Sequence, residues 1–321
     1  MGRLPIAVLS ALVWLGCDGD SNSGADATAP VTDARVNDAF WGCPLGGYRC
    51  SGGCSGTFLC QSPVPGKVSV CGQLVSVASN QYVRRSNANG LLCGDAPDTS
   101  SPCNAQLFAF DAVEYAANPA TAVPLRAGRI QVDDCGRFRF ESIDFPTMAP
   151  LVTLATRNDP AADTSPWLES AVVIPVAANQ LIPDQRMYMV DRTTDDQWTA
   201  SAGNPFAGET FNERGVYMPL FLSSEPNADE HKRTAGVTVG GAGPTFYFND
   251  TDANNVTNVA PGQTQTGTNG ASLVTGIGAT PPTTTGAEPP GCAWPSRPAD
   301  TIKGVTIIHE HIAEAANAPC E

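Results

Sequence analysis

Residues 128–143 read GRIQVDDCGRFRFESI, with apolar and polar side chains alternating on both sides of an Asp-Asp-Cys-Gly sequence. The same alternation occurs upstream in residues 68–77 (VSVCGQLVSV) and 105–110 (AQLFAF). Alternation with a period of two residues is typical of β-strands that bury one face. These segments therefore predict strands that are separated by turns.

The order of these segments resembles that of carboxypeptidase regulatory-like domains, which are transthyretin-like β-sandwiches. The matching residues are a V-x-G-x-[VL] motif from Val70 to Leu74, a later apolar strand, and a D-x-G-x-F-x-F motif that begins at Asp134. The resemblance covers about residues 68–157, and it implies a fold without implying an activity.

In such domains the acidic residue and the glycine of the second motif form a tight turn between two strands. The resemblance therefore implies a turn at Asp134 and Gly136. It also implies that Phe138 and Phe140 alternate into the core, and that a return strand lies within residues 146–154.

The second half of the chain contains a similar order of segments, at residues 236–239, 245–250 and 263–277. Phe246 and Phe248 stand where the earlier segment has its own aromatic pair, and an Asn-Gly sequence replaces the turn that contains Asp. Repetition of a segment order within one chain predicts two similar structural units.

We therefore predict an all-β protein with two small antiparallel β-sandwiches in tandem. The first spans residues 65–160 and the second spans residues 166–321, with a boundary in the polar segment 159–165. The strongly apolar segment 304–312 is expected to return to the second sandwich as its last strand, which a disulfide ties down.

Residues 1–16 have the features of an export signal, with Arg3, an apolar run of about a dozen residues and a small Gly16 before Cys17. The run is too short to span a bilayer, which needs about 20 apolar residues. The pattern resembles the lipobox of bacterial lipoproteins, although Trp14 stands where that family prefers Leu. The resemblance implies that Cys17 is acylated, and ordinary secretion is the alternative.

The segment 17–40 is polar and lacks a hydrophobic period, so it predicts a flexible tether. Residues 41–64 hold four cysteines among glycines and predict a disulfide knot, with a zinc site as the alternative. With Cys17 set aside, ten of the eleven cysteines remain, an even number that suits disulfides in an exported protein. The simplest arrangement pairs Cys93 with Cys103 and Cys292 with Cys320. The disulfide candidates are Cys43, Cys50, Cys54, Cys60, Cys71, Cys93, Cys103, Cys135, Cys292 and Cys320.

The chain of 321 residues carries a net charge of −14, and only 16% of its residues are charged. An acidic surface repels a phosphate backbone, so nucleic acid is excluded as a partner. We expect the protein in the bacterial cell envelope, at the outer membrane or the periplasmic face, with an envelope protein or a glycan as partner. The chain resembles lipoproteins of myxobacteria-like Gram-negative bacteria, a resemblance that implies no activity.

His309 and His311 form an H-x-H motif within the apolar segment 304–312. Residues two apart on a strand share a face, so two imidazoles about 6–7 Å apart can ligate one metal ion such as zinc. The alternative interpretation is that both are half-buried residues of an edge strand. Asp250 and Asp252 resemble the opening of a calcium-binding loop, with a solvated turn as the alternative.

The sequence contains no serine-nucleophile elbow, no H-E-x-x-H motif and no phosphate-binding glycine loop. Two acidic pairs, Asp133/Asp134 and Asp195/Asp196, are candidates for glycoside hydrolysis, but adjacent residues on a strand face opposite ways. We therefore predict no catalytic residues.

The function that these observations predict is a non-catalytic binding or structural module that acts through the loops or edge strands of its sandwiches. The alternative is a metal-dependent envelope enzyme, or a metal-binding protein, that uses His309 and His311 with zinc, or holds calcium. Glycan binding is a third interpretation, with three tryptophans as stacking platforms or, alternatively, as core residues. These are Trp167, Trp198 and Trp294.

Overall fold

The computed structural model describes most of the chain beyond residue 59. The described residues are 60–79, 83, 105–126, 130, 132, 136–158, 166–223, 233–240, 243–249, 256–277, 283–285, 292–294 and 301–315. The predicted signal peptide, the tether, residues 41–59 of the predicted knot and the predicted boundary at 159–165 lie outside these residues.

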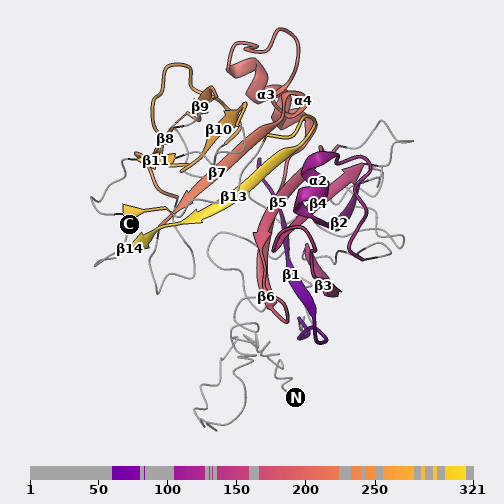
Figure 1. Ribbon diagram of the computed structural model, residues 1–321. Helices are drawn as coiled ribbons and strands as arrows, with labels where there is room; N and C mark the ends of the chain where they lie inside the picture. The colour runs from indigo at the N-terminus through magenta and orange to yellow at the C-terminus, as the bar shows by residue number, and fades with distance from the viewer. Residues whose placement is uncertain are drawn as a thin grey trace, which may run out of the picture. The chain divides into compact units, whose positions relative to one another are not determined.

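The larger sheet has seven strands in the order β2-β4-β5-β13-β7-β10-β9, and Figure 1 shows β13 between β5 and β7. β13 is parallel to both of these neighbours, whereas the other strand pairs of this sheet are antiparallel. The strands are β2 (Ala105–Asp111), β4 (Leu151–Asn158), β5 (Ser170–Pro175), β7 (Val216–Leu222), β9 (Thr245–Tyr247), β10 (Ser272–Thr275) and β13 (Thr306–Ile312).

The smaller sheet has the order β3-β1-β6, with β1 antiparallel to β3 and parallel to β6. Its strands are β1 (Lys67–Ser76), β3 (Arg137–Asp144) and β6 (Leu181–Met189). Two short pairs complete the described strands. They are β8 (Thr238–Gly240) with β11 (Thr283–Thr285) and β12 (Cys292–Ala293) with β14 (Glu314–Ala315).

One core cluster joins strands of both sheets. Buried side chains from β1, β3 and β6 meet side chains from β2, β4 and β5. Its members include Val70, Leu74, Phe138, Phe140, Met187, Leu107, Leu154 and Ile174. Burying a large apolar side chain contributes about 1.5–3 kcal/mol, so this layer is a principal source of stability.

The strands of the second half of the larger sheet are buried on both faces. β7 shows this clearly, because Met218 and Leu220 join one core cluster while Tyr217 and Phe221 join another. Successive side chains on a strand point to opposite faces, so the sheet separates two apolar layers here. The helix residues Trp198 and Phe211 pack into the first of these layers.

The strands that alternation predicted at residues 68–77 and 105–110 are confirmed as β1 and β2. The turn glycine Gly136 has a positive φ of 71°, and Phe138 and Phe140 are 0% and 1% exposed, as the resemblance implied. The return strand begins later than predicted, at Leu151, because residues 147–150 form bends.

The all-β fold with sandwiched sheets is confirmed, but its strand pairing differs from the two antiparallel sandwiches that we expected. Parallel pairs occur in both sheets, and the larger sheet takes strands from both halves of the chain. Segment 304–312 forms β13, which lies between β5 and β7 in the larger sheet, while the predicted disulfide that ties it down lies outside the described side chains. A near-continuous apolar run is typical of parallel strands that are buried on both faces, and Thr306, Ile307 and Ile308 are all buried.

The segments of the suggested repeat form strands, but they pair in a different way from those of the first half. β1 pairs with β3 and β6, whereas β8 pairs with β11 among the described residues. Gly270 of the Asn-Gly turn has a positive φ of 59°, and Phe248 is fully buried. The two halves of the chain therefore share the order of their segments and a glycine turn, but their strands do not pair in the same way.

Among the described residues, three short helices that we did not expect interrupt the strands. They are α2 (Ala112–Ala117), α3 (Arg192–Ser201) and α4 (Phe211–Arg214). Asp111 and Asp191 cap the first two, and Thr210 forms a capping box with Glu213 at the third. None of the described helices is long and apolar enough to cross a membrane.

A disulfide joins Cys60 to Cys71, two of the candidate cysteines, across a sequence separation of 11 residues. It connects the end of the predicted knot to the buried middle of β1, where Cys71 is fully buried. Closing a loop of this length stabilises the fold by about 3 kcal/mol in the chain-entropy model. The side chains of the other candidate cysteines lie outside the described residues, so their pairing stays a prediction.

Candidate functional site

The imidazole pair predicted from sequence lies on β13, in the centre of the seven-stranded sheet. His309 and His311 share a face, with ring centroids 6.4 Å apart, and each residue is 3% exposed. The shared face agrees with their spacing on a strand. Their assignment to a half-buried edge strand is wrong, because β13 has a hydrogen-bonded neighbour on each side.

His309 acts as a hydrogen-bond acceptor for the neighbouring strand β5. The paired residues of β13 and β5 end at Ile307 and Ala171, and beyond them the backbone N–H of Val173 donates to Nε2 of His309 at 2.9 Å. Because Nε2 accepts here, the imidazole is neutral and its proton is on Nδ1. The ring therefore continues the contact between strands where their backbone pairing ends.

His311 contacts the opposite neighbour, β7. Its Nε2 lies 2.6 Å from the hydroxyl oxygen of Tyr217, and its ring packs against Phe221 with centroids 5.4 Å apart. Trp294 packs edge-on against Phe221 at 5.7 Å. The two histidines are thus built into an aromatic layer, and each uses its Nε2 in a contact within the protein.

Metal binding by these histidines stays a prediction. In the part of the chain that the structure describes, no three His, Cys, Asp or Glu side chains are grouped so that they can hold a metal ion. The calcium candidates Asp250 and Asp252 and the knot cysteines of the zinc alternative lie outside the described residues. The chemistry of the described pair is hydrogen bonding and ring packing within the sheet.

Glu310, between the two histidines, points toward the smaller sheet. Its Oε1 accepts hydrogen bonds from the Tyr188 hydroxyl at 2.6 Å and from Arg186 Nη1 at 3.3 Å, both on β6. Burial acts to raise the pKa of Glu310, but Arg186, the Tyr188 hydroxyl and Arg233 outweigh it and hold the pKa below its usual value. A charged carboxylate therefore links the two sheets.

The hydrogen-bond partners of Glu310 could not be predicted from the sequence around it. Arg186 is a charged residue in the apolar half-strand RMYMV, and this is the one local sign of a buried polar contact. Tyr188 is 122 residues from Glu310 in the chain, and an alternating strand alone does not indicate where its polar residues find partners. The same holds for Tyr217, which contacts a histidine 94 residues away.

A second acid, the half-buried Glu169, joins α2 to the start of β5. The Tyr115 hydroxyl donates to Oε1 of Glu169 at 2.7 Å, and Tyr115 is 1% exposed. Burial raises the pKa of Glu169, while the Tyr115 hydroxyl and Arg157 partly offset that effect. This hydrogen bond links α2 to the residue that precedes β5.

The acidic pair Asp195/Asp196 lies in the helix α3, which turns one side chain toward the core and the other toward solvent. Asp195 is 2% exposed and accepts a hydrogen bond from the backbone N–H of Asn212 at 2.9 Å, whereas Asp196 is exposed. The two carboxylates therefore do not flank a common site. The other acidic pair, Asp133/Asp134, lies outside the described residues.

Asp195 makes stability depend on pH. Burial raises its pKa from 3.8 to about 6, so the folded state holds a proton that the unfolded state releases. Its contribution to stability is largest below pH 3.8 and is lost as pH rises to about 6. We expect Asp195→Asn to raise the free energy of unfolding at pH 7 by up to about 3 kcal/mol, at about 1.4 kcal/mol per pKa unit.

Urea denaturation at several pH values between 4 and 7 measures this effect. The excess in the free energy of unfolding of Asp195→Asn over the wild type should be greatest at neutral pH and should shrink as the pH falls. The exposed neighbour provides the matched control, because Asp196→Asn removes an equal charge without a buried carboxylate. Equal pH profiles for the wild type and Asp195→Asn would contradict the assignment.

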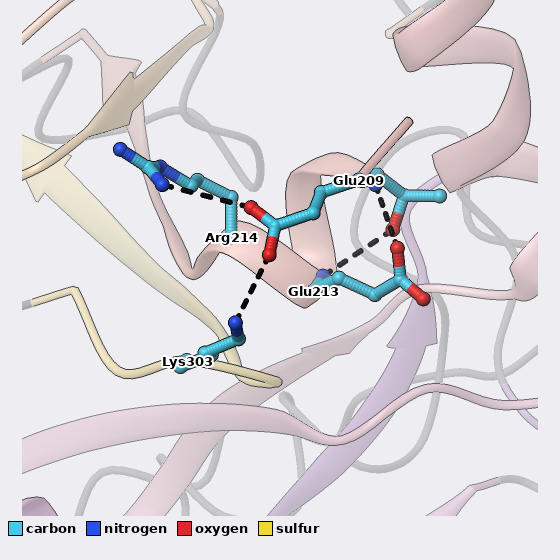
Figure 2. Close-up of polar contacts among 5 residues, drawn as sticks. Glu209, Glu213, Arg214 and Lys303 are labelled. Carbon is cyan, nitrogen blue, oxygen red and sulfur yellow. Dashed lines mark hydrogen bonds and ion pairs between the residues drawn. The ribbon is translucent and has the colours of Figure 1, made fainter. Parts of the chain in front are cut away.

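An exposed ion cluster lies where the loop before α4 meets the loop before β13 (Figure 2). Glu209 binds Lys303 at 3.0 Å and Arg214 at 3.6 Å through its two carboxylate oxygens. The hydrogen bond from Lys303 is the main cause that lowers the pKa of Glu209. Exposed ion pairs contribute little to stability, so this cluster is a surface feature rather than a site.

The three tryptophans that we considered as glycan platforms are core residues. Trp167, Trp198 and Trp294 are 2%, 0% and 7% exposed. The indole N–H of Trp198 donates to the carbonyl of Val256, and that of Trp294 donates to the carbonyl of Leu222 at 3.4 Å. Core packing, the alternative interpretation, is therefore confirmed.

Comparison with known proteins does not identify a family. No family model and no curated protein matches the chain. Among solved structures, the shaft pilin SpaA from Lactobacillus rhamnosus GG is 10% identical, with a TM-score of 0.23 over 78% of this chain and 98% of the pilin. The minor pilin GBS52 from Streptococcus agalactiae is 11% identical, with a TM-score of 0.22 over 78% of this chain and 98% of that protein. TM-scores this far below 0.5 do not establish a common fold, so these likenesses carry no conclusion about function.

Proposed function

We propose that this chain is an exported, non-catalytic protein of the bacterial cell envelope that is anchored through Cys17 and acts as a binding or structural module. The observation that carries the proposal is the arrangement around the two histidines. Both rings are buried in the sheet, with Nε2 of His309 engaged by Val173 and Nε2 of His311 engaged by Tyr217. Side chains used in this way hold strands together.

Export is supported by the disulfide between Cys60 and Cys71. Structural disulfides form and persist in oxidising compartments and are rare in the cytosol. The bond ties Cys60, at the end of the predicted knot, to Cys71 in the middle of β1, near the start of the described residues.

Loops are favoured over strand edges as the binding surface, because the described edge strands of the two larger sheets each carry or adjoin a feature that opposes pairing with another strand. In the smaller sheet, β6 has Pro183 followed by Asp184, and β3 has a bulge with Ser142 at a φ of 53°. In the larger sheet, Phe110 of the edge strand β2 forms a β-bridge with Pro124. Phe248, which directly follows the other edge strand β9, forms a β-bridge with Val259.

A protein partner is favoured over a glycan. Glycan recognition uses exposed aromatic faces, and the candidate tryptophans are buried in the core. We therefore propose an envelope protein as the partner, bound through a loop surface of the described fold.

The anchor is tested by replacing the lipidated cysteine. In a Gram-negative host, Cys17→Ser is expected to abolish partitioning into the detergent phase and incorporation of labelled palmitate, because the acyl chains hold the protein on the membrane. The matched control is the double variant Cys60→Ser/Cys71→Ser, which loses cysteines outside the lipobox and should keep both properties. Retention of palmitate and of detergent partitioning by Cys17→Ser would remove the anchor from the proposal.

A further inference from the structure

The methionines of the chain are divided between the core and the surface. The chain has 5 methionines, and all of those after Met1 lie in the part that the structure describes. Met187, Met189 and Met218 are each 0% exposed, whereas Met148 is 68% exposed. Because oxidants must reach a thioether to modify it, these residues differ strongly in their expected reactivity.

The three buried methionines belong to two separate core clusters. Met187 and Met189 lie on β6, within the cluster that joins the two sheets. Met218 lies on β7, in the apolar layer that also holds Trp198 and Phe211. An oxidant reaches these sulfur atoms only when the strands open, and opening of core strands costs nearly the whole free energy of unfolding.

Met148 lies in the segment that connects β3 to β4, where residues 147–150 form bends. The buried carboxylate of Asp111 fixes this segment, because its Oδ2 accepts the backbone N–H groups of Thr147 at 3.1 Å and Met148 at 3.2 Å. The other oxygen of Asp111 accepts the backbone N–H of Val113 in α2 at 3.0 Å. The backbone at Met148 is therefore tied to the fold, while its side chain extends into solvent.

We propose that Met148 is the site at which oxidants of the peroxide class modify the folded protein, and that the product is methionine sulfoxide. The sulfur lone pair attacks one oxygen of hydrogen peroxide, and the O–O bond breaks. The hydroxide that leaves takes the proton from the new S–OH group and becomes water. Sulfur loses the two electrons that the peroxide gains, so the thioether and one peroxide give one sulfoxide and one water.

Oxidation at Met148 leaves the fold intact. The hydrogen bond between Met148 and Asp111 uses a backbone N–H group, which the reaction does not change. The new S–O group is polar, and at an exposed position water solvates it. The same group on a core methionine would be buried among apolar side chains and would disrupt their packing. The fold thus tolerates oxidation at its surface methionine and protects the other three.

Peptide mapping by mass spectrometry tests the assignment on the processed chain carrying Cys17→Ser, treated with hydrogen peroxide at neutral pH. Met148 should gain one oxygen atom at a rate within about threefold of that of N-acetylmethionine amide in the same solution, because its side chain is accessible. Met187, Met189 and Met218 should each react at least about tenfold more slowly, because they wait for core strands to open. Equal rates at all of these residues, or a Met148 that stays unmodified, would overturn the proposal.

Two variants and a stability measurement complete the test. Met148→Leu is expected to abolish oxygen uptake by the folded protein over the same period. Met187→Leu is the matched control, because it removes a core thioether with little change in volume and should leave uptake unchanged. Equal uptake by Met148→Leu and the parent protein would contradict the assignment. A protein oxidised at Met148 alone should keep the urea unfolding midpoint of the untreated protein, and a lower midpoint would show that oxidation here does not spare the fold.

Discussion

The Gly72→Ala protein is expected to lose most of its stability, with a free energy of unfolding lowered by more than about 4 kcal/mol. A Cβ atom at residue 72 would lie 1.8 Å from the backbone oxygen of Gln185 and 2.6 Å from Cζ of Phe138. Gln185 is on β6 and Phe138 is on β3, the two neighbours of β1. The collision with backbone is relieved only if β6 moves away from β1, which breaks the smaller sheet.

Chemical denaturation measures the loss, and soluble yield replaces it if no folded protein accumulates. Total stabilities of about 5–15 kcal/mol are usual, so a loss of this size leaves a marginal fold at best. Gly66→Ala is the matched control, because Gly66 has a φ of 82° and a Cβ atom there would meet nothing within 4 Å. It should cost only the backbone strain, about 1–2 kcal/mol. Similar unfolding midpoints for the two variants would contradict the packing argument.

Gly72 also shows what the sequence can and cannot supply. It is the glycine of the V-x-G-x-[VL] motif, so the resemblance by itself marks its position. The motif does not indicate the reason, which is the close approach of β6, a strand that begins more than a hundred residues later. Local pattern identifies a strand, whereas its neighbours depend on contacts between distant segments.

The same distinction explains the position of β13. The apolar run from Val305 to Ile308 predicted a strand correctly, because burial of both faces leaves an obvious local signature. Its place at the centre of the sheet, parallel to β5 and β7, follows from pairing that no local period encodes. The helices α3 and α4 had cap residues in the sequence, but they are too short to show a helical period.

For the candidate site, the spacing of His309 and His311 predicted their shared face, because that property is local to a strand. Their burial was not predicted, since it depends on which strands flank β13. Their contacts with Val173 and Tyr217 were also out of reach, at separations of 136 and 94 residues. The properties of the two histidines that bear on function, their burial and their hydrogen bonds, therefore depend on which distant strands pair with β13.

Glu310→Ala is expected to lower the free energy of unfolding by about 3–5 kcal/mol at neutral pH, the usual cost of removing one partner from a buried ion pair. The side chain of Glu310 is 20% exposed and that of Arg186 is 14% exposed, so solvent screens the pair only weakly. The variant removes the carboxylate that Arg186 and the Tyr188 hydroxyl bind, and so breaks the polar link between β13 and β6. Urea denaturation at pH 7 measures the loss.

Two further variants separate charge from simple truncation. Glu209→Ala also removes a glutamate with two cationic partners, but Glu209 is an exposed residue, so its loss should leave the unfolding midpoint unchanged. Glu310→Gln keeps the shape and removes the charge. Because the folded pKa of Glu310 lies below its usual value of 4.5, the charge stabilises the fold above that pH, and this stabilisation is lost as pH falls through the folded pKa. The difference between wild type and Glu310→Gln should therefore be constant near neutral pH and disappear in acid. A difference that persists in acid would mean that the carboxylate acts by packing, and that the charged link between the sheets is not what stabilises them.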